Sequence, residues 1–216
     1  MLAAIFGDET MSDPMRRLQE KCDCTPDGSF GPNTAKGIAK HFDLSAEQAA
    51  HLLGQASHES GGFKRARENL NYSWEGLMRT WPTRFKTEEE AKEYHRQPFK
   101  IAGKVYLRES LGNFSEADAR AYIGRGWLQL TGKLNYRSFA SDMGVPEVMT
   151  DPSLVEDEYA FETALWFFQK NGLLKMADEG VTPDVIKKIT RRVNGGYHGL
   201  NDRTNQTNKI YEWLKT

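Results

Sequence analysis

Two glutamates that lie close together in the chain could form a catalytic pair. Glu59 belongs to the stretch HESGGF at 58–63, and Glu68 opens the stretch ENLNYS at 68–73. We expect Glu59 in the last turn of a helix and Glu68 in the loop that follows, so that both carboxyl groups face one cleft. A helix C-terminus and burial behind Phe63 both disfavour a charged carboxylate, which suits Glu59 to the role of general acid. Glu68, in a polar loop, should stay ionised and could act as the base.

Other chemistries find less support in the same residues. A zinc protease of the HExxH type needs a second histidine where this chain has Gly62. The chain contains no GxSxG, G-x-G-x-x-G or Walker A motif. A purely structural interpretation, in which Glu68 pairs with Arg65 or Arg67, remains as strong as the catalytic one on residue types and spacing alone.

The position of Glu59 depends on a helix predicted over 45–60. Ser45 and Gln48 form a capping box at its start. One apolar stripe follows at helical spacing, made of Ala49, Leu52, Leu53 and Ala56. The run Ser60-Gly61-Gly62 ends the helix.

The remaining pattern predicts a mainly helical protein with a small β element. Further helices are expected over 14–21, 34–42, 73–79, 87–95, 98–111, 132–143, 152–171, 182–194 and 203–214. The segment 152–171 is apolar nearly all round, which predicts the central buried helix. Residues 127–131 alternate, which predicts a short strand with Trp127, Gln129 and Thr131 on one face.

Length and composition limit the partners. A chain of 216 residues is enough for one domain, in one or two lobes. The net charge of −1 argues against nucleic acid, and no segment approaches the roughly 20 apolar residues of a membrane span. Residues 1–6 are too short and lack the basic lead of a signal peptide, so we expect synthesis in a cytoplasm and outside help for export. Cys22 and Cys24 are expected to be free thiols.

Four stretches taken together resemble glycoside hydrolase family 19, the chitinase-like group of the lysozyme superfamily, and look closest to its phage endolysin branch. They are HESGGF (58–63), ENLNYS (68–73), YIGRGWLQLTGKLNY (122–136) and VNGGYHGLNDR (193–203). The resemblance implies a lysozyme-like fold of two lobes with a cleft between them. It assigns 45–216 to a catalytic domain and leaves 1–44 as a helical extension, which would either brace that domain or contact the cell wall. Within the extension, DGSFGPNT at 27–34 looks like a fragment of small peptidoglycan-binding modules, or else like a structural turn.

The resemblance also implies roles for individual residues. Glu59 would be the general acid, Glu68 the general base that activates water, and Thr131 a hydroxyl that helps to hold this water. The mechanism would be a single displacement with inversion, for which the two carboxyl groups should lie about 6.5–9.5 Å apart. No metal or organic cofactor is needed.

Sugar-binding positions follow in the same way. The matching residues are Gln129, Asn135, Asn194 and Arg203. Three aromatic side chains are candidates for stacking on sugar faces: Tyr72, Tyr122 and Trp127. His198 stands where the plant chitinases usually have an acid, which weakens the transfer of their binding network to this side of the cleft.

The expected function is that of a bacteriolytic endolysin, which hydrolyses β-1,4 bonds of the peptidoglycan glycan strand. The alternatives are a bacterial chitinase, a lytic transglycosylase with one acid and no base, and a non-catalytic wall-binding protein. The expected partners are the glycan strand and a holin-type pore, with no nucleic acid and no stable membrane insertion. We expect a monomer, made in the host cytoplasm and active on the wall in the periplasm. Which glycosidic bond is cut stays open.

Overall fold

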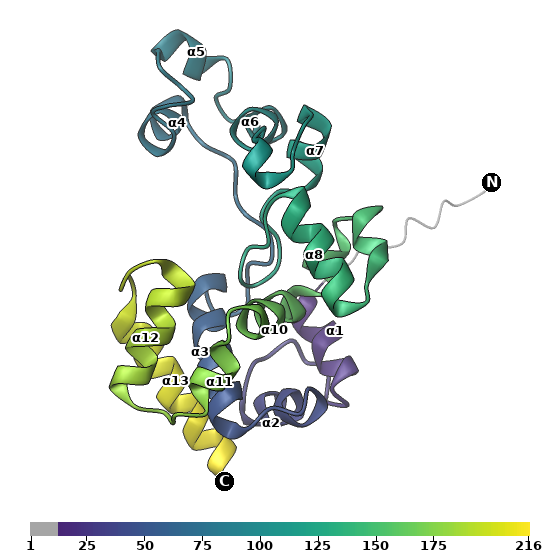
Figure 1. The fold of residues 1–216 in the computed structure, drawn as a ribbon, viewed down its shortest axis with the longest axis vertical. Helices are drawn as coiled ribbons and strands as arrows, with labels where there is room; N and C mark the ends of the chain where they lie inside the picture. The colour runs from purple at the N-terminus through teal and green to yellow at the C-terminus, as the bar shows by residue number, and fades with distance from the viewer. Residues whose placement is uncertain (1–12) are drawn as a thin grey trace, which may run out of the picture.

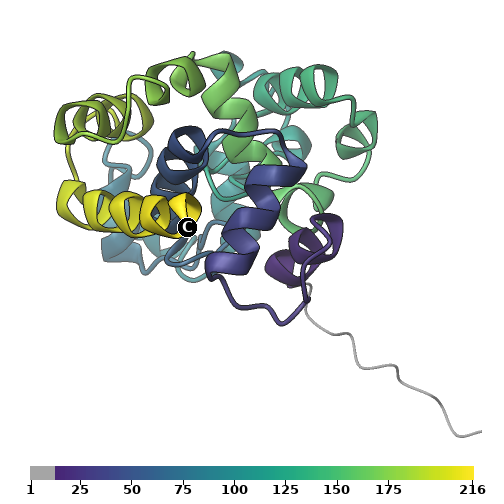
Figure 2. The ribbon, with the colours of Figure 1, turned by 90° about the horizontal axis from the view of Figure 1, so that it is seen from below.

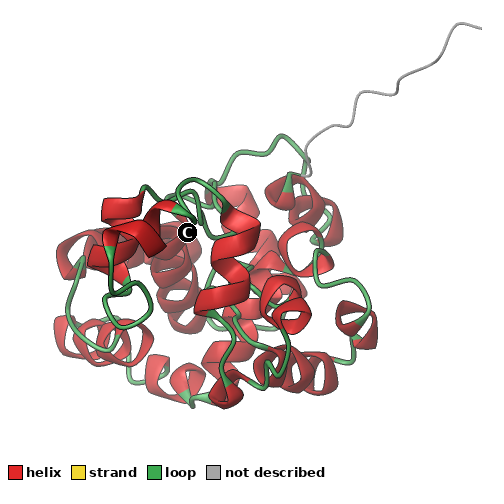
Figure 3. Cartoon of the chain, turned by 90° about the horizontal axis from the view of Figure 1, so that it is seen from above, coloured by secondary structure: helices red, strands yellow, loops and turns green. Residues whose placement is uncertain are grey.

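Helices carry the regular structure of residues 13–216, the part of the chain that this computed structural model describes (Figure 1). Its α-helices are α1 (Pro14–Lys21), α2 (Pro32–His41), α3 (Ala46–Ser60), α4 (Trp74–Thr80), α5 (Glu88–Lys92), α6 (Pro98–Val105), α7 (Glu116–Ala121), α8 (Lys133–Met143), α9 (Leu154–Asp157), α10 (Ala160–Lys170), α11 (Leu173–Ala177), α12 (Pro183–Asn194) and α13 (Leu200–Lys215). Two short 3-10 helices are η1 (Glu109–Leu111) and η2 (Pro146–Met149). The predicted mainly helical class is confirmed, and in the described residues the β element is reduced to isolated bridges between Arg67 and Arg125 and between Arg125 and Leu130 (Figure 3).

The buried side chains form three clusters that correspond to regions of the ribbon. The largest joins α1, α2, α3 and α10–α13. A second lies among α4, α5 and α6, at the opposite end of the molecule (Figure 1). A third surrounds α8, between these two regions (Figure 1). Residues 66–73 and 122–131 run between the two ends, and they contain the predicted catalytic stretches.

Helix α3 is the central helix of the large cluster. Its capping box is present, since the Ser45 hydroxyl accepts from the Gln48 N–H at 3.1 Å and the Gln48 side chain accepts from the Ser45 N–H at 3.3 Å. Gly61 ends it with a φ of +63°. Gly54 allows α13 to approach, because a Cβ at this position would lie 2.2 Å from Oγ1 of Thr207. Figure 2 shows the C-terminal end of α13 beside α2 on this side of the molecule.

The single long helix predicted over 152–171 is wrong. The structure has α9 and α10 with a break at Glu158 and Tyr159. Tyr159 has φ −121° and ψ 22°, outside the helical range, and the Lys21 ammonium donates to the Glu158 carbonyl at 3.1 Å. A side chain from α1 therefore takes the place of a helix N–H at this carbonyl. Most of α10 is buried, as expected, but the central position belongs to α3.

The strand predicted over 127–131 is also wrong. Residues 126–129 form a turn in which the Gln129 N–H donates to the Gly126 carbonyl at 3.2 Å, and Gln129 adopts a φ of +50°. Arg125 and Leu130 pair across the turn. Trp127 and Gln129 consequently point to different environments, whereas a strand would have placed them on one face.

The N-terminal segment shares the core of the catalytic helices. Met15 and Leu18 of α1 and Ile38 of α2 belong to the same buried cluster as α3, so the boundary expected at residue 44 divides no core. Gln19 organises the DGSFGPNT turn. Its Nε2 donates to Oδ1 of Asp27, the Ser29 carbonyl and Oγ1 of Thr34, and its Oε1 accepts from the Gly28 N–H.

Further predictions concern the start of α2, the first residues of the chain and a membrane-spanning segment. Helix α2 begins at Pro32, two residues before the predicted cap Thr34. The predictions for residues 1–12 lie outside the described residues. No helix within 13–216 combines the length and apolar character that a membrane crossing requires.

Candidate active site

Glu59 lies in the last turn of α3, as predicted, and is held there by an arginine of α13. Nη2 of Arg203 donates to Oε1 of Glu59 at 2.6 Å. The same guanidinium donates to Oε1 of Gln55 at 2.6 Å and to the His198 carbonyl at 3.1 Å. Glu59 itself keeps 28% of its side chain exposed. The Glu59 carboxyl group is therefore partly exposed to solvent, while the buried guanidinium of Arg203 holds one of its oxygens.

The structure contradicts the predicted sugar-binding role of Arg203. We expected its side chain to contact sugar, but only 1% of it is exposed. Its three side-chain hydrogen bonds go to Glu59, Gln55 and the His198 carbonyl, so it cannot touch a substrate. What it contacts at the site is the carboxyl group of Glu59.

Phe63, which we expected to cover Glu59, belongs to the aromatic core and is 6% exposed. Its ring packs against Phe30 at 4.4 Å and against Trp127 at 4.6 Å, centroid to centroid. The hydrogen bond to the Glu59 carboxyl group comes from Arg203.

Glu68 lies in a more enclosed place than its polar sequence suggested. Its Oε1 accepts from the Gly124 N–H at 2.6 Å, and its Oε2 accepts from the Tyr106 hydroxyl at 2.5 Å. Burial raises the pKa of Glu68, although both hydrogen bonds and the guanidinium groups of Arg125 and Arg67 oppose the shift. Burial therefore acts against the expected ionised state of Glu68, and the hydrogen bonds and guanidinium groups act in its favour. A raised pKa strengthens the carboxylate as a base as long as it stays below the working pH.

Gly124 brings three predicted side chains to one point. A Cβ at this position would lie 2.8 Å from Oε1 of Gln129, 3.2 Å from Oγ1 of Thr131 and 3.3 Å from Cδ of Glu68. The turn at 126–129 returns Gln129 and Thr131 to this backbone, and the Thr131 hydroxyl donates to the Gln129 carbonyl at 2.9 Å. Glu68, Gln129 and Thr131 are thus neighbours, although the strand that was to align them does not exist.

Two cavities join this group to Glu59. One, of about 400 Å³, is lined by Gln129, Thr131 and Asn135 among others. The other, of about 200 Å³, is lined by Glu59, Gln129 and Asn194 among others. Both cavities include Gln129, Leu128 and Phe167, so they adjoin. The polar residues expected to bind sugar, apart from Arg203, therefore follow one groove that contains Glu59 and passes Thr131, a neighbour of Glu68.

Two of the three aromatic candidates belong to the core. Trp127 has no exposed surface and lies between Phe63 and Phe161. Tyr122 is 6% exposed, and its hydroxyl donates to the Met149 carbonyl at 3.0 Å. Neither can stack on a sugar. Tyr72 is partly exposed and packs edge-on against Trp81, so its stacking role stays a prediction.

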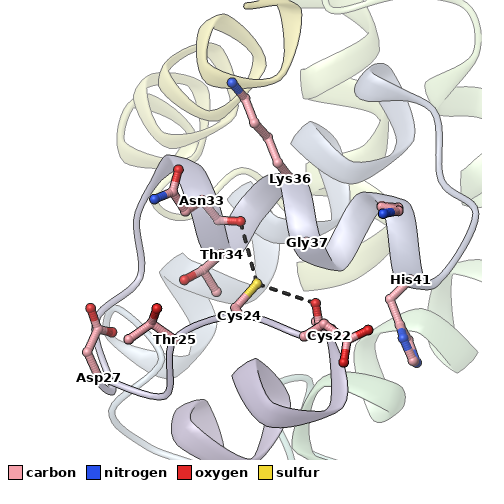
Figure 4. Close-up of a pocket in the computed structure, with 11 residues that line it drawn as sticks. Cys22, Cys24, Thr25, Asp27, Asn33, Thr34, Lys36, Gly37 and His41 are labelled. Carbon is pink, nitrogen blue, oxygen red and sulfur yellow. Dashed lines mark hydrogen bonds between the residues drawn. The ribbon is translucent and has the colours of Figure 1, made fainter.

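A third cavity, of about 670 Å³, lies between α1 and α2 and shares no lining residue with the two described above (Figure 4). The Cys24 thiol points at the backbone there, with Sγ 3.5 Å from the Cys22 carbonyl and 3.6 Å from that of Asn33. Both cysteines are free, as predicted. Burial raises the pKa of Cys22 to about 12 and also raises that of Cys24, so both thiols stay protonated at neutral pH.

The close packing at Gly124 makes a sharp test of the site. Replacing Gly124 by alanine should lower hydrolysis by roughly ten- to a hundredfold, because the new methyl group displaces Gln129 and crowds Glu68. The melting temperature should change little, since the nearest atom is the free end of a flexible side chain. Gly31→Ala is the matched control, because a Cβ there meets nothing within 4 Å. Full activity of Gly124→Ala would show that these side chains do not need their present positions.

A pair of carboxyl groups near a polar groove is typical of the active site of a glycosidase. The family model "Chitinase class I" matches residues 29–183, so it begins inside the predicted extension. The chain is 35% identical over 193 residues to a glycosyl hydrolase family 19 domain-containing protein of Haemophilus influenzae, covering 85% of this chain and 90% of that protein. The chain belongs to glycoside hydrolase family 19 and is a glycosidase.

Relatives also include plant enzymes. The chain is 35% identical over 180 residues to an endochitinase of Arabidopsis thaliana, covering 80% of this chain but only 50% of the plant protein. Chitinase C from Streptomyces griseus HUT6037 aligns over 97% of this chain and 96% of its own, with a TM-score of 0.48 and 16% identity. The chain thus spans nearly the whole of its Haemophilus relative and about half of the Arabidopsis one.

Proposed function

We propose that this glycosidase is a phage endolysin, which hydrolyses β-1,4 bonds of the peptidoglycan glycan strand. Glu59 is the general acid and Glu68 the general base. The observation that carries the proposal is the placement of the two carboxyl groups: Glu59 lines the cavity that also contains Gln129 and Asn194, and Glu68 lies beside Gln129 and Thr131 at Gly124.

The nucleophilic water would lie between Glu68 and Thr131. The Thr131 hydroxyl already donates its proton to the Gln129 carbonyl, so towards a water its oxygen can only accept. A water that donates one hydrogen to Thr131 and the other to Glu68 keeps a lone pair free. Glu68 removes the second of these protons as that lone pair attacks the anomeric carbon.

Glu59 would protonate the departing glycosidic oxygen. Arg203 occupies its Oε1, so the proton can sit on Oε2 and pass to the substrate in the groove. Gln129, Asn135 and Asn194 would bind sugar hydroxyl and N-acetyl groups along this groove, as their side chains line its two cavities. Water attack on the face opposite the leaving group inverts the anomeric carbon, which requires a separation of about 6.5–9.5 Å between the carboxyl groups.

The choice of peptidoglycan rests on the four motif stretches, which resemble the phage endolysin branch of the family. As an endolysin, the protein would act as a monomer in the periplasm after release through a holin-type pore. Chitin is the second candidate substrate, because the plant relatives are named endochitinases.

Digestion of purified peptidoglycan and of chitin oligomers side by side tests the proposal. We expect new reducing ends from peptidoglycan and lysis of Gram-negative cells whose outer membrane has been permeabilised. Cleavage of chitin alone would assign the protein to the chitinases. Anhydro-muramic ends would indicate a lytic transglycosylase, and sedimentation with cell walls without any new ends would indicate a binding protein.

A further inference from the structure

The Tyr106 hydroxyl makes the shortest polar contact of the proposed base. It donates to Oε2 of Glu68 at 2.5 Å, while the Gly124 N–H donates to Oε1 at 2.6 Å. Each carboxylate oxygen thus accepts one bond and keeps one lone pair. Because the two donors lie on opposite oxygens, the plane of the carboxylate is fixed. No motif of the sequence pointed to Tyr106, which lies 38 positions from Glu68.

Two other tyrosine–glutamate pairs make the same hydrogen bond with less burial of the carboxyl group. Tyr159 donates to Glu147, and Tyr211 donates to Glu47. In both pairs the tyrosine hydroxyl is the largest cause of a lowered glutamate pKa. The same bond is present at Glu68, but there burial outweighs it and the pKa is raised. The hydroxyl of Tyr106 therefore stabilises the ionised carboxylate in a place that disfavours it.

Tyr106 is held rigidly in this position. It is the C-cap residue of α6, and its carbonyl accepts from Nδ2 of Asn113 at 2.8 Å. Oδ1 of Asn113 accepts from the Lys133 N–H at 3.0 Å, at the start of α8, and only 1% of Asn113 is exposed. Burial and the neighbouring Glu68 both raise the pKa of Tyr106, so its hydroxyl keeps its proton and stays a donor. The donor is thus tied to the end of α6 and, through Asn113, to the start of α8.

We propose that Tyr106 is a positioning residue for the base: its hydroxyl keeps the buried Glu68 ionised and turned towards the nucleophilic water. This inference rests on the proposed function, in which Glu68 is the base. The inference adds to the proposed site the C-cap residue of α6, a helix that is remote from α3.

The charges around the pair determine how the site responds to pH. The groups that act on Glu68 or on Tyr106 are Arg67, Arg125, Arg108, Tyr72 and Tyr136. Glu156 is within ion-pairing distance of both Arg67 and Arg125, so it offsets part of their positive charge. Without the Tyr106 hydrogen bond, Glu68 would be equally buried but would accept from a single donor, the Gly124 N–H.

The test is the pH profile of kcat for Tyr106→Phe, measured on the full chain with purified peptidoglycan. In the wild type, hydrolysis falls on the acid side as Glu68 takes up its proton. Loss of one hydrogen bond to a charged group raises the pKa of Glu68 further, so the acid limb should move to higher pH by about one unit. At a fixed pH within the wild-type acid limb, activity should fall about tenfold. The alkaline limb should stay in place.

Tyr211→Phe is the matched control, because it removes the same kind of bond from Glu47 at the far end of α3. Its acid limb should coincide with that of the wild type. A folded Tyr106→Phe protein with an unshifted limb and wild-type kcat would overturn the proposal.

Two further measurements separate the possible failures. If Tyr106→Phe does not fold, 3-fluorotyrosine at position 106 keeps the ring and makes the hydroxyl a stronger donor, so the acid limb should move to lower pH; an unmoved limb would contradict the proposal. Glu68→Gln tests the underlying assignment. An inactive Glu68→Gln protein with an unshifted Tyr106→Phe profile would refute the role of Tyr106 alone, whereas an active Glu68→Gln protein would refute Glu68 as the base.

Discussion

Replacing Glu59 by glutamine is expected to abolish glycan hydrolysis while the protein stays folded. The amide has the shape of the carboxyl group, and its oxygen can still accept from Arg203. It has no proton to give to the leaving oxygen, and a positioned general acid contributes about 10²- to 10⁴-fold to the rate. Release of reducing ends from peptidoglycan, together with a thermal melt, measures both effects.

Glu47→Gln is the matched control for this variant. Glu47 stands in the first turn of the same helix, away from the groove, and its carboxylate accepts from Tyr211. Its activity should equal that of the wild type. Normal lysis by a folded Glu59→Gln protein would contradict the assignment of Glu59 as the general acid.

Arg203→Met is expected to reduce both stability and activity. Methionine fills much of the same volume but cannot donate to Glu59, Gln55 or the His198 carbonyl. Leaving buried acceptors without donors should lower the free energy of unfolding by roughly 3 kcal/mol. The folded fraction should also hydrolyse glycan slowly, since Glu59 loses the group that fixes its position.

Urea denaturation followed by activity measurements on the folded protein separates the two effects. Arg191→Met, on the exposed face of α12, is the control and should match the wild type in both. Arg203→Lys should be intermediate, because an ammonium keeps the charge but not the forked geometry that reaches three acceptors. Wild-type turnover by folded Arg203→Met would show that Glu59 needs no such support.

Local rules were sufficient to predict the helix that carries Glu59. The capping box at Ser45, the apolar stripe and Gly61 in a left-handed conformation are all determined by residues within a few positions of one another. The same holds for α1, α8 and α12, whose observed bounds lie close to the predicted ones. These elements need no knowledge of what packs against them.

Predictions failed where a distant residue decides the outcome. Lys21 of α1 bonds the Glu158 carbonyl and accompanies the break that separates α9 from α10. The alternation of residues 127–131 does not produce a strand, because residues 126–129 form a turn. In this turn Gln129 has a positive φ and Trp127 is buried in the core. An alternating pattern cannot reveal such a turn, since it reports only the order of polar and apolar residues.

The electrostatic supports of the two carboxyl groups were beyond local rules as well. Arg203 is 144 positions from Glu59, and Tyr106 carries no motif. The resemblance placed Arg203 at the site but not in contact with the acid. Only the packing of α13 on α3 and of α6 on the central connection brings these donors to their glutamates.

The anomeric configuration of the first product tests the central claim most directly. Proton NMR during cleavage of a soluble peptidoglycan fragment by the wild-type protein records each new reducing end before it equilibrates. An acid at the leaving oxygen and a base that activates water on the opposite face of the sugar predict the α anomer from a β-1,4 bond. Initial formation of the β anomer, or of anhydro ends without a reducing sugar, would contradict the assignment of Glu59 and Glu68 as an inverting pair.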